Sequence, residues 1–288
     1  MKNIFEETKY ILKKYGITAN KSLGQNFLIS DEAVEGIIEK SEVCKEDFVI
    51  EIGPGLGTLT KYLLDNAGKV LCIELDTRMI KILNDRFSLY ENFELINEDV
   101  LKVDLKKVIE ENLKIEGIKN VKVVANLPYY ITTPIIMKLL EERLNIKSIT
   151  VMVQKEVAER LAEKPGGKES GAITYSIAYY TDAKIVLNVG RECFVPSPEV
   201  DSAVIKLDLL KEPRVKVSDE KLFFKVVKAS FMLKRKTLVN GLVNGKIFNS
   251  KQEAEECLNK LGIDLKIRGE KLTLEQFAEI SEYVKSIR

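Results

Sequence analysis

Over its first 210 residues the chain alternates short apolar segments with amphipathic ones, and this alternation limits the folds open to it. Short segments rich in β-branched residues and separated by helices are typical of a mostly parallel sheet covered on both faces. The last strands lack long helices between them, which leaves antiparallel pairing open to them. The sequence therefore predicts an α/β fold. Strands are expected at Phe48–Ile52, Val70–Glu74, Phe93–Asn97, Val121–Ala125, Ile149–Val153, Ile185–Val189 and Val204–Leu209, and early helices at Gly57–Asn66, Thr77–Phe87 and Pro134–Arg143.

The composition changes after Leu210. Residues 211–214 form a polar, proline-marked linker, and the pattern beyond it favours helices. The sequence therefore predicts two domains. Residues 1–212 form the α/β domain, with a leading helix at Phe5–Tyr15 and a loop at Gly16–Gln25, and residues 213–288 form a small all-α domain. Its helices are expected at Glu220–Leu233, Lys236–Val243, Gln252–Leu261 and Leu274–Lys285.

The chain contains no histidine, and its four cysteines form no CxxC pair. The usual general base and the usual zinc ligands are therefore missing, so we expect chemistry without a metal. The N-terminal segment shows no export signal, and no apolar run reaches the roughly 20 residues that cross a bilayer. Together with reduced cysteines, these features predict a cytoplasmic protein without a membrane span. No feature suggests an extended interface, so a monomer is expected.

Basic residues are concentrated near the C-terminus. Residues 1–220 hold 31 Lys and Arg against 36 Asp and Glu, whereas residues 221–288 hold 14 against 8. Between Lys221 and Gln252 there are eight basic residues and no acid. Such a block attracts a polyanion, although a solvated helix face without acids has the same composition.

A glycine-rich turn, residues 53–57 with glycines at 53, 55 and 57, follows the first expected strand. Glycines let the backbone approach a ligand, and the helix after the turn offers free N–H groups. The G-x-G-x-G spacing is shorter than the G-x-G-x-x-G of dinucleotide binders and suits a nucleoside without a pyrophosphate. A turn that only joins strand to helix is the alternative.

Two acids strengthen the nucleoside interpretation. Glu74 ends the second strand, where a carboxylate can bind both hydroxyls of a ribose. Asp99 follows the third strand, where it can accept a hydrogen bond from an adenine amine. Each acid taken alone is also common at an exposed strand end. Because the glycines, Glu74 and Asp99 follow three strands in series, we infer that the ligand is S-adenosylmethionine.

The fourth strand ends in Asn126-Leu127-Pro128-Tyr129. The Asn126 amide oxygen and the Leu127 carbonyl can accept hydrogen bonds from an aryl amine, which frees the lone pair of its nitrogen. Pro128 fixes the turn, and Tyr129 offers a ring for stacking on a base. A base must leave its stack to reach such a pocket, and Phe194 is either its second stacking partner or a core residue. These residues predict methyl transfer to the amine without a strong base.

These motifs match a known family. The chain resembles the ribosomal RNA adenine dimethyltransferases of the small-subunit dimethyladenosine transferase type. The resemblance implies a Rossmann-like, S-adenosylmethionine-dependent methyltransferase domain followed by a small helical domain. It also implies methylation of N6 of two adjacent adenosines in a small-subunit rRNA hairpin to N6,N6-dimethyladenosine, with S-adenosylhomocysteine as product. The resemblance rests on the segments 21–28, 51–57, 74–76, 126–129, 194–203, 229–231 and 234–238, and so spans nearly the whole chain.

The resemblance also implies roles for residues. The cofactor contacts, with Gly55 added from the glycine turn, are Asn26, Leu28, Gly53, Gly55, Glu74, Asp99 and Asn126. The residues that position the target base are Asn126, Leu127, Pro128 and Tyr129, with Phe194 as stacking partner. The candidates for contacts with RNA phosphates are Lys225, Lys228, Lys234, Arg235 and Lys236. The family often has a polar residue where this chain has Tyr130.

Three alternatives stay open. Large-subunit rRNA adenine N6-methyltransferases share the pocket but generally lack Gly-Pro-Gly in the turn and the proline-rich string after Phe194. A nicotinamide-dependent oxidoreductase would use the same sheet, but the glycine spacing and the lack of a proton donor disfavour it. A non-catalytic ribosome assembly factor would keep a relic pocket, which intact Glu74, Asp99 and Asn126 disfavour, although an assembly role is compatible with catalysis.

Overall fold

The computed structural model describes residues 3–20, 24–167, 170–233 and 235–288. The chain divides into two compact units, Met1–Ala158 with Lys184–Leu209, and Glu159–Ala183 with Leu210–Arg288. The domain boundary expected after residue 212 stays a prediction. The second compact unit also contains residues 159–183, which the predicted all-α domain does not include. Part of the motif at residues 21–28, and Lys234, lie outside the described residues.

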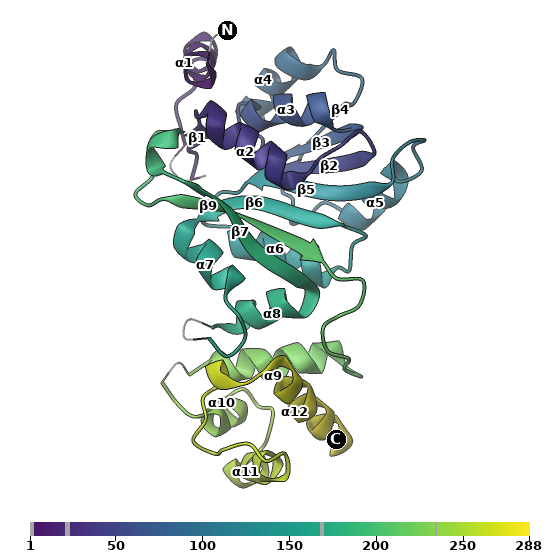
Figure 1. Cartoon of the computed structure of the whole chain (residues 1–288), viewed down its shortest axis with the longest axis vertical. Helices are drawn as coiled ribbons and strands as arrows, with labels where there is room; N and C mark the ends of the chain where they lie inside the picture. The colour runs from purple at the N-terminus through teal and green to yellow at the C-terminus, as the bar shows by residue number, and fades with distance from the viewer. Residues whose placement is uncertain (1–2, 21–23, 168–169, 234) are drawn as a thin grey trace. The chain divides into compact units, whose positions relative to one another are not determined.

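The described part of the first unit is built around a seven-stranded sheet of order β4-β3-β2-β5-β6-β9-β7 (Figure 1). The strands from β2 to β6 pair in parallel, and β9 runs antiparallel to β6. Every residue of β2 is buried, because helices cover both faces of a parallel sheet. The strands are β2 (Asp47–Ile52), β3 (Lys69–Glu74), β4 (Phe93–Asn97), β5 (Asn120–Asn126), β6 (Ser148–Gln154), β7 (Thr181–Val189) and β9 (Ser202–Leu209).

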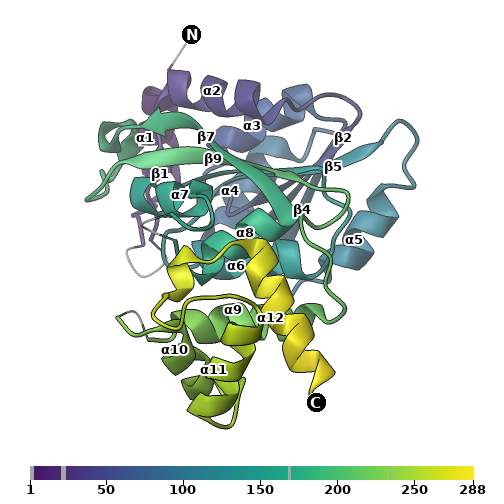
Figure 2. The ribbon, with the colours of Figure 1, turned by 60° about the horizontal axis from the view of Figure 1, so that its bottom comes forward.

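Helices α2 and α3 lie on one face of this sheet, and α5 and α6 lie on the other (Figure 2). Side-chain caps fix where two helices begin: Ser30 accepts a hydrogen bond from Ala33 N–H before α2, and Asp76 accepts one from Arg78 N–H before α4. The helices of the first unit are α1 (Ile4–Tyr15), α2 (Asp31–Ser41), α3 (Thr58–Asn66), α4 (Thr77–Phe87), α5 (Leu105–Asn112) and α6 (Thr132–Glu141).

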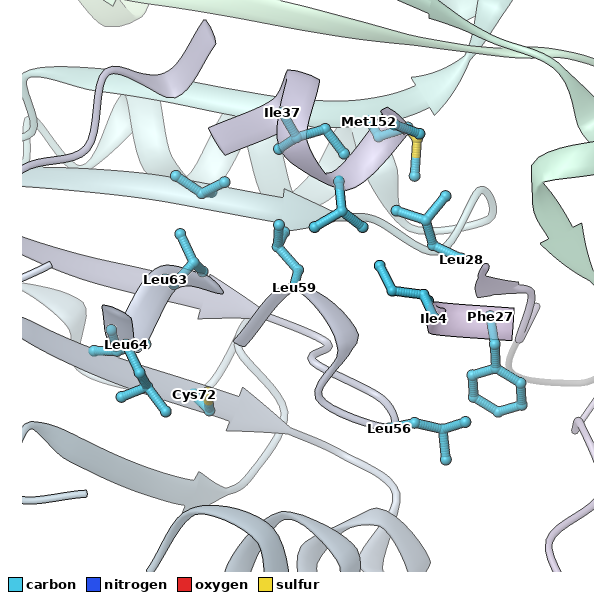
Figure 3. Close-up of a cluster of buried hydrophobic side chains, with 14 of the residues drawn as sticks. Ile4, Phe27, Leu28, Ile37, Leu56, Leu59, Leu63, Leu64, Cys72 and Met152 are labelled. Atoms are coloured by element: carbon cyan, nitrogen blue, oxygen red, sulfur yellow. The ribbon is translucent and has the colours of Figure 1, made fainter. Parts of the chain in front are cut away.

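A hydrophobic core joins the sheet to the helices on its α2 face (Figure 3). It also takes in β1 (Phe27–Leu28), which pairs with β8 (Phe194–Val195) in a separate two-stranded antiparallel sheet. Both residues of β1 are buried. The core therefore holds the segment before α2 against the sheet. Its members include Ile4, Phe27, Leu28, Ile37, Leu59, Leu63, Cys72 and Met152.

The second unit is mainly helical. Its central helix α9 (Glu220–Phe231) contacts α8 (Ala172–Tyr180), α10 (Leu238–Asn244) and α12 (Leu274–Ser286), and α11 (Lys251–Lys260) packs on α10 and α12. Tyr175 of α8 packs its ring against Phe231 and Phe277 and donates its hydroxyl to the Leu272 carbonyl at 2.6 Å. Aromatic packing therefore joins residues of the 159–183 segment to the C-terminal helices.

The α/β fold predicted from the sequence is confirmed, and every expected strand and helix is present. Strand β4 and helix α4 have the expected bounds, and the other elements have ends shifted by one to four residues. The largest shift is at β7, which begins at Thr181 rather than Ile185. Helices α5, α7 (Lys155–Ala162) and α8 were not predicted, and α8 gives a weak helical pattern because most of its residues are buried. No helix in the described ranges is long and apolar enough to cross a membrane.

Candidate active site

The carboxyl ends of the parallel strands meet at a pocket of about 1120 Å³, a volume that includes its open mouth. Ligands of open α/β sheets bind at this edge. The pocket brings together every residue that the sequence predicted for the cofactor or the target base, while their individual roles stay predictions. These residues are Asn26, Leu28, Gly53, Gly55, Glu74, Asp99, Asn126, Leu127, Pro128, Tyr129 and Phe194.

The glycine turn after β2 forms one wall. Gly53 and Gly55 have φ angles of 67° and 58°, which favour glycine. A Cβ at Gly53 would lie 3.8 Å from Pro128, and one at Gly55 would lie 3.6 Å from the Phe27 ring, so the turn approaches both neighbouring walls closely. Gly57 has another role. A Cβ added at this position would lie 2.3 Å from the Phe87 ring and would prevent α3 from packing on α4.

Glu74 is buried at the end of β3, and two backbone N–H groups hold its carboxylate. Oε2 accepts a hydrogen bond from Gly55 at 3.0 Å, and Oε1 accepts one from Asp76 at 2.8 Å. Burial raises the pKa of Glu74, while these two bonds oppose the shift. Each carboxylate oxygen has a further lone pair, so the group can still accept two hydroxyls.

The sequence did not identify Gln25 as part of the site. Gln25 lines the pocket and donates its side-chain Nε2–H to Asp76 Oδ2 at 2.8 Å. Arg78 also bonds Asp76, and the pKa of Asp76 is lowered chiefly by the hydrogen bond from Arg78. These contacts tie the segment before β1 to the end of β3, next to Glu74.

Asp99 and Leu75 line the pocket together. Asp99 Oδ1 accepts a hydrogen bond from Leu101 N–H at 2.9 Å, and no described residue bonds its Oδ2. The Leu75 side chain is 49% exposed, which is high for a leucine beside a buried strand. The Asp99 carboxylate can accept a hydrogen bond from the edge of a purine, and the exposed Leu75 side chain can pack against the face of the same ring. Leu75 was not among the predicted site residues, although an apolar residue directly after a strand-end acid was a usable signal.

Asn126 and Leu127 present two oxygens from adjacent residues. The Asn126 Nδ2 lies 3.5 Å from the Asn26 carbonyl, a long contact that leaves Oδ1 as an acceptor. Leu127 N–H donates to the Met152 carbonyl at 3.1 Å, whereas no N–H of a described residue bonds the Leu127 carbonyl. Two neighbouring acceptors are therefore available to one amine.

Two aromatic side chains, Tyr129 and Phe194, also line the pocket. The Tyr129 hydroxyl lies 2.8 Å from Oγ of Ser202, a fully buried residue of β9. Burial raises the pKa of Tyr129, so its hydroxyl stays protonated near neutral pH. Phe194 of β8 is buried opposite Leu28 in the two-stranded sheet and also lines the pocket. Phe194 is therefore a buried residue that also belongs to the site.

Glu51, which sequence analysis missed, lies beneath the glycine turn. It is buried in β2, and Oε2 accepts hydrogen bonds from Thr60 at 2.6 Å and from Cys72 Sγ at 3.4 Å. Burial raises the pKa of Glu51 to about 7, although these bonds oppose the shift. A single acid inside an apolar strand gave no sequence signal for this behaviour.

Glu51→Gln is expected to change how stability depends on pH. The native wild-type protein keeps the Glu51 proton up to a pKa of about 7, whereas the unfolded chain releases it near the ordinary glutamate pKa of 4.5. The native state binds more protons in this window, so the wild-type free energy of unfolding falls as pH rises from 4.5 to 7, by up to roughly 3 kcal/mol. The free energy of unfolding of Glu51→Gln should not show this fall.

Urea unfolding of the ligand-free protein across this pH range measures the difference, with the exposed Glu110→Gln as control. Parallel pH profiles for wild type and Glu51→Gln would contradict the assignment.

The residues predicted to bind RNA belong to the second unit. Lys225 and Lys228 are exposed on α9, and Arg235 and Lys236 are exposed after it, while Lys234 lies outside the described residues. Among the described residues, no three His, Cys, Asp or Glu side chains gather as a metal site would require.

Comparison with known proteins identifies the family. The family model for ribosomal RNA adenine dimethylase matches residues 16–286 of this chain. The chain belongs to the ribosomal RNA adenine dimethylase family. This membership confirms the resemblance inferred from the motifs and makes the chain an rRNA methyltransferase rather than an oxidoreductase.

Relatives and similar solved structures agree with the assignment. The chain is 48% identical, over 96% of its length and 98% of the relative, to ribosomal RNA small subunit methyltransferase A of Clostridium acetobutylicum. It is 51% identical to the protein of the same name from Bacillus pumilus, over 96% of this chain and 95% of that one. The fold is similar to a dimethyladenosine transferase from Plasmodium falciparum, with a TM-score of 0.74, 26% identity and coverage of 90% and 98%. The 23S rRNA methyltransferase ErmE gives a TM-score of 0.65 at 25% identity, with coverage of 90% and 100%.

Proposed function

We propose that this dimethylase uses S-adenosylmethionine to methylate N6 of two adjacent adenosines in a small-subunit rRNA hairpin. The products are N6,N6-dimethyladenosines and S-adenosylhomocysteine. The observation that carries the proposal is the gathering of all predicted cofactor and base residues in one pocket of a family member. The protein acts as a cytoplasmic monomer in biogenesis of the small ribosomal subunit.

The pocket fits the cofactor. Glu74 offers two carboxylate oxygens to the ribose hydroxyls, and Asp99 Oδ2 is an acceptor for the adenine amine beside Leu75. The glycine backbone at Gly53 and Gly55, which has no side chain, forms the wall for the methionine part together with Asn26 and Leu28. When bound, S-adenosylmethionine supplies an electrophilic methyl group.

The residues around Asn126 prepare the acceptor nitrogen. An adenine amine donates its two N–H groups to Asn126 Oδ1 and the Leu127 carbonyl, which draws the nitrogen toward tetrahedral geometry and frees its lone pair. Tyr129 and Phe194 hold the flipped base by stacking. Once the nitrogen carries the methyl group it is acidic, so water takes the proton and no histidine is needed.

The small subunit is favoured over the large one as the source of substrate. Relatives that are about half identical over nearly their full length carry a small-subunit name, whereas the 23S rRNA methyltransferase ErmE is only 25% identical. Methylation assays with unmethylated small subunits, unmethylated large subunits and free small-subunit rRNA test the proposal, with mass spectrometry of the nucleosides as readout. We expect N6,N6-dimethyladenosine in small-subunit rRNA only. Methylation of large subunits, or of no adenosine, contradicts it.

Reversing the charge of Lys225, Arg235 and Lys236 to glutamate is expected to weaken binding to small subunits. Lysine and arginine contacts with phosphate release counterions, so each lost contact lowers the slope of log affinity against log salt by about 1. Binding measured at several salt concentrations checks this, with S-adenosylmethionine affinity unchanged. The matched control reverses three exposed lysines of the first unit, Lys106, Lys114 and Lys147. Equal salt slopes for wild type and the first variant would rule out the RNA-binding assignment.

A further inference from the structure

Tyr130 is an aromatic side chain at the pocket that the proposed reaction does not use. It follows Tyr129 directly, lines the pocket, and is 56% exposed. No described residue forms a ring–ring contact or a hydrogen bond with its side chain. The base-positioning residues beside it are far less accessible, since Leu127 is buried and Tyr129 is held by Ser202. Tyr130 therefore presents an open aromatic surface beside the site of the target base.

The backbone of the segment before β1 passes beside the Tyr130 ring at Gly24. A Cβ at Gly24 would lie 3.5 Å from Tyr130 Cδ1, which is ordinary van der Waals distance. Gly24 has a φ of 60°, a conformation that glycine adopts readily, so the backbone passes the ring without a side chain between them. A ring that is 56% exposed, beside a backbone that carries no side chain at Gly24, can serve as a stacking platform.

We propose that Tyr130 stacks on the nucleobase next to the adenosine that occupies the pocket. The inference rests on the proposed function and adds a second base subsite to it. When one base leaves its stack, its neighbour loses a stacking partner. An aromatic side chain beside the pocket replaces that partner, and it accepts any base because every base has a π face. Tyr130 thereby helps to hold the strand while the target base is extruded.

The chemistry of the ring separates stacking from other contacts. A hydrogen bond from the hydroxyl would be lost in Tyr130→Phe, whereas stacking would persist. A purely apolar contact would persist in Tyr130→Leu, which has no π face. An exposed tyrosine on α1, Tyr10, is 57% exposed and takes no part in the site, so Tyr10→Ala is a control matched in residue type and exposure.

The test measures kcat and KM of these variants on unmethylated small subunits, together with S-adenosylmethionine affinity by calorimetry. We expect Tyr130→Ala and Tyr130→Leu to raise KM for the subunit by roughly 5- to 100-fold, the effect of losing one stacked base. Tyr130→Phe and Tyr10→Ala should stay near wild type, and cofactor affinity should not change in any variant. A wild-type KM for the subunit in Tyr130→Ala or in Tyr130→Leu would overturn the inference. Weakened S-adenosylmethionine binding in any Tyr130 variant would also overturn it.

The same assay separates failure of this inference from failure of the proposed function. A wild-type protein that dimethylates small-subunit adenosines while Tyr130→Ala behaves identically leaves the function standing and removes Tyr130 from it. A wild-type protein that methylates no adenosine in the subunit refutes the function, and the inference falls with it.

Discussion

Asn126→Ala is expected to lower kcat for methyl transfer to small subunits by on the order of 100-fold or more, because it removes one of two oxygens that prepare the acceptor amine. The Leu127 carbonyl survives the substitution but cannot orient both N–H groups alone. Single-turnover methylation with saturating cofactor measures the effect directly. Binding of the subunit should change little, since phosphate contacts elsewhere supply most of the affinity.

Strand β5 provides a matched control for this substitution. Asn120 stands at its other end and bonds Asp47 Oδ1 at 3.0 Å, far from the pocket lining. Asn120→Ala should keep full kcat even if it lowers the melting temperature. Full activity in Asn126→Ala, or equal losses in the two variants, would remove the amide from the mechanism.

Glu74→Gln is expected to weaken S-adenosylmethionine binding by roughly 10- to 100-fold. Hydrogen bonds to a charged group contribute about 1.5–3 kcal/mol, and the amide replaces one acceptor oxygen with a donor. That donor would also face the Gly55 or Asp76 N–H that now bonds the carboxylate. Calorimetric titration of cofactor into wild type, Glu74→Gln and a control, Glu94→Gln on the neighbouring β4, measures the effect.

The pH dependence of cofactor binding provides a second readout. Because burial raises the pKa of Glu74, the carboxylate takes up its proton earlier than an ordinary glutamate as pH falls. Wild-type affinity should therefore decline on acidification, and the affinity of Glu74→Gln should decline less. A cofactor affinity unaffected by Glu74→Gln would contradict the ribose assignment.

The residues that the sequence predicted for the site line one pocket because they follow the strand ends, while their roles stay predictions. Gly53, Glu74, Asp99 and Asn126 each lie at or just after the end of an apolar strand, and parallel strands bring such positions to one edge. The fold was predictable for the same reason, since strands buried on both faces give apolar segments that are easily recognised.

Other features depend on contacts that no local pattern encodes. Ser202 holds the Tyr129 hydroxyl across 73 residues of sequence, and Gln25 bonds Asp76 across 51. Glu51 has an unusual pKa only because Thr60, Cys72 and the burial of β2 surround it. Helix α8 lacks a polar face because most of it is buried, so its periodicity is weak.

A crystal structure of the protein with S-adenosylmethionine bound tests the proposed pocket chemistry most directly. We expect ribose hydroxyls at Glu74, adenine beside Asp99 and Leu75, and a methyl group that faces the Asn126 amide oxygen and the Leu127 carbonyl. A nucleoside bound outside this pocket, or a methyl group directed away from Asn126, would contradict it.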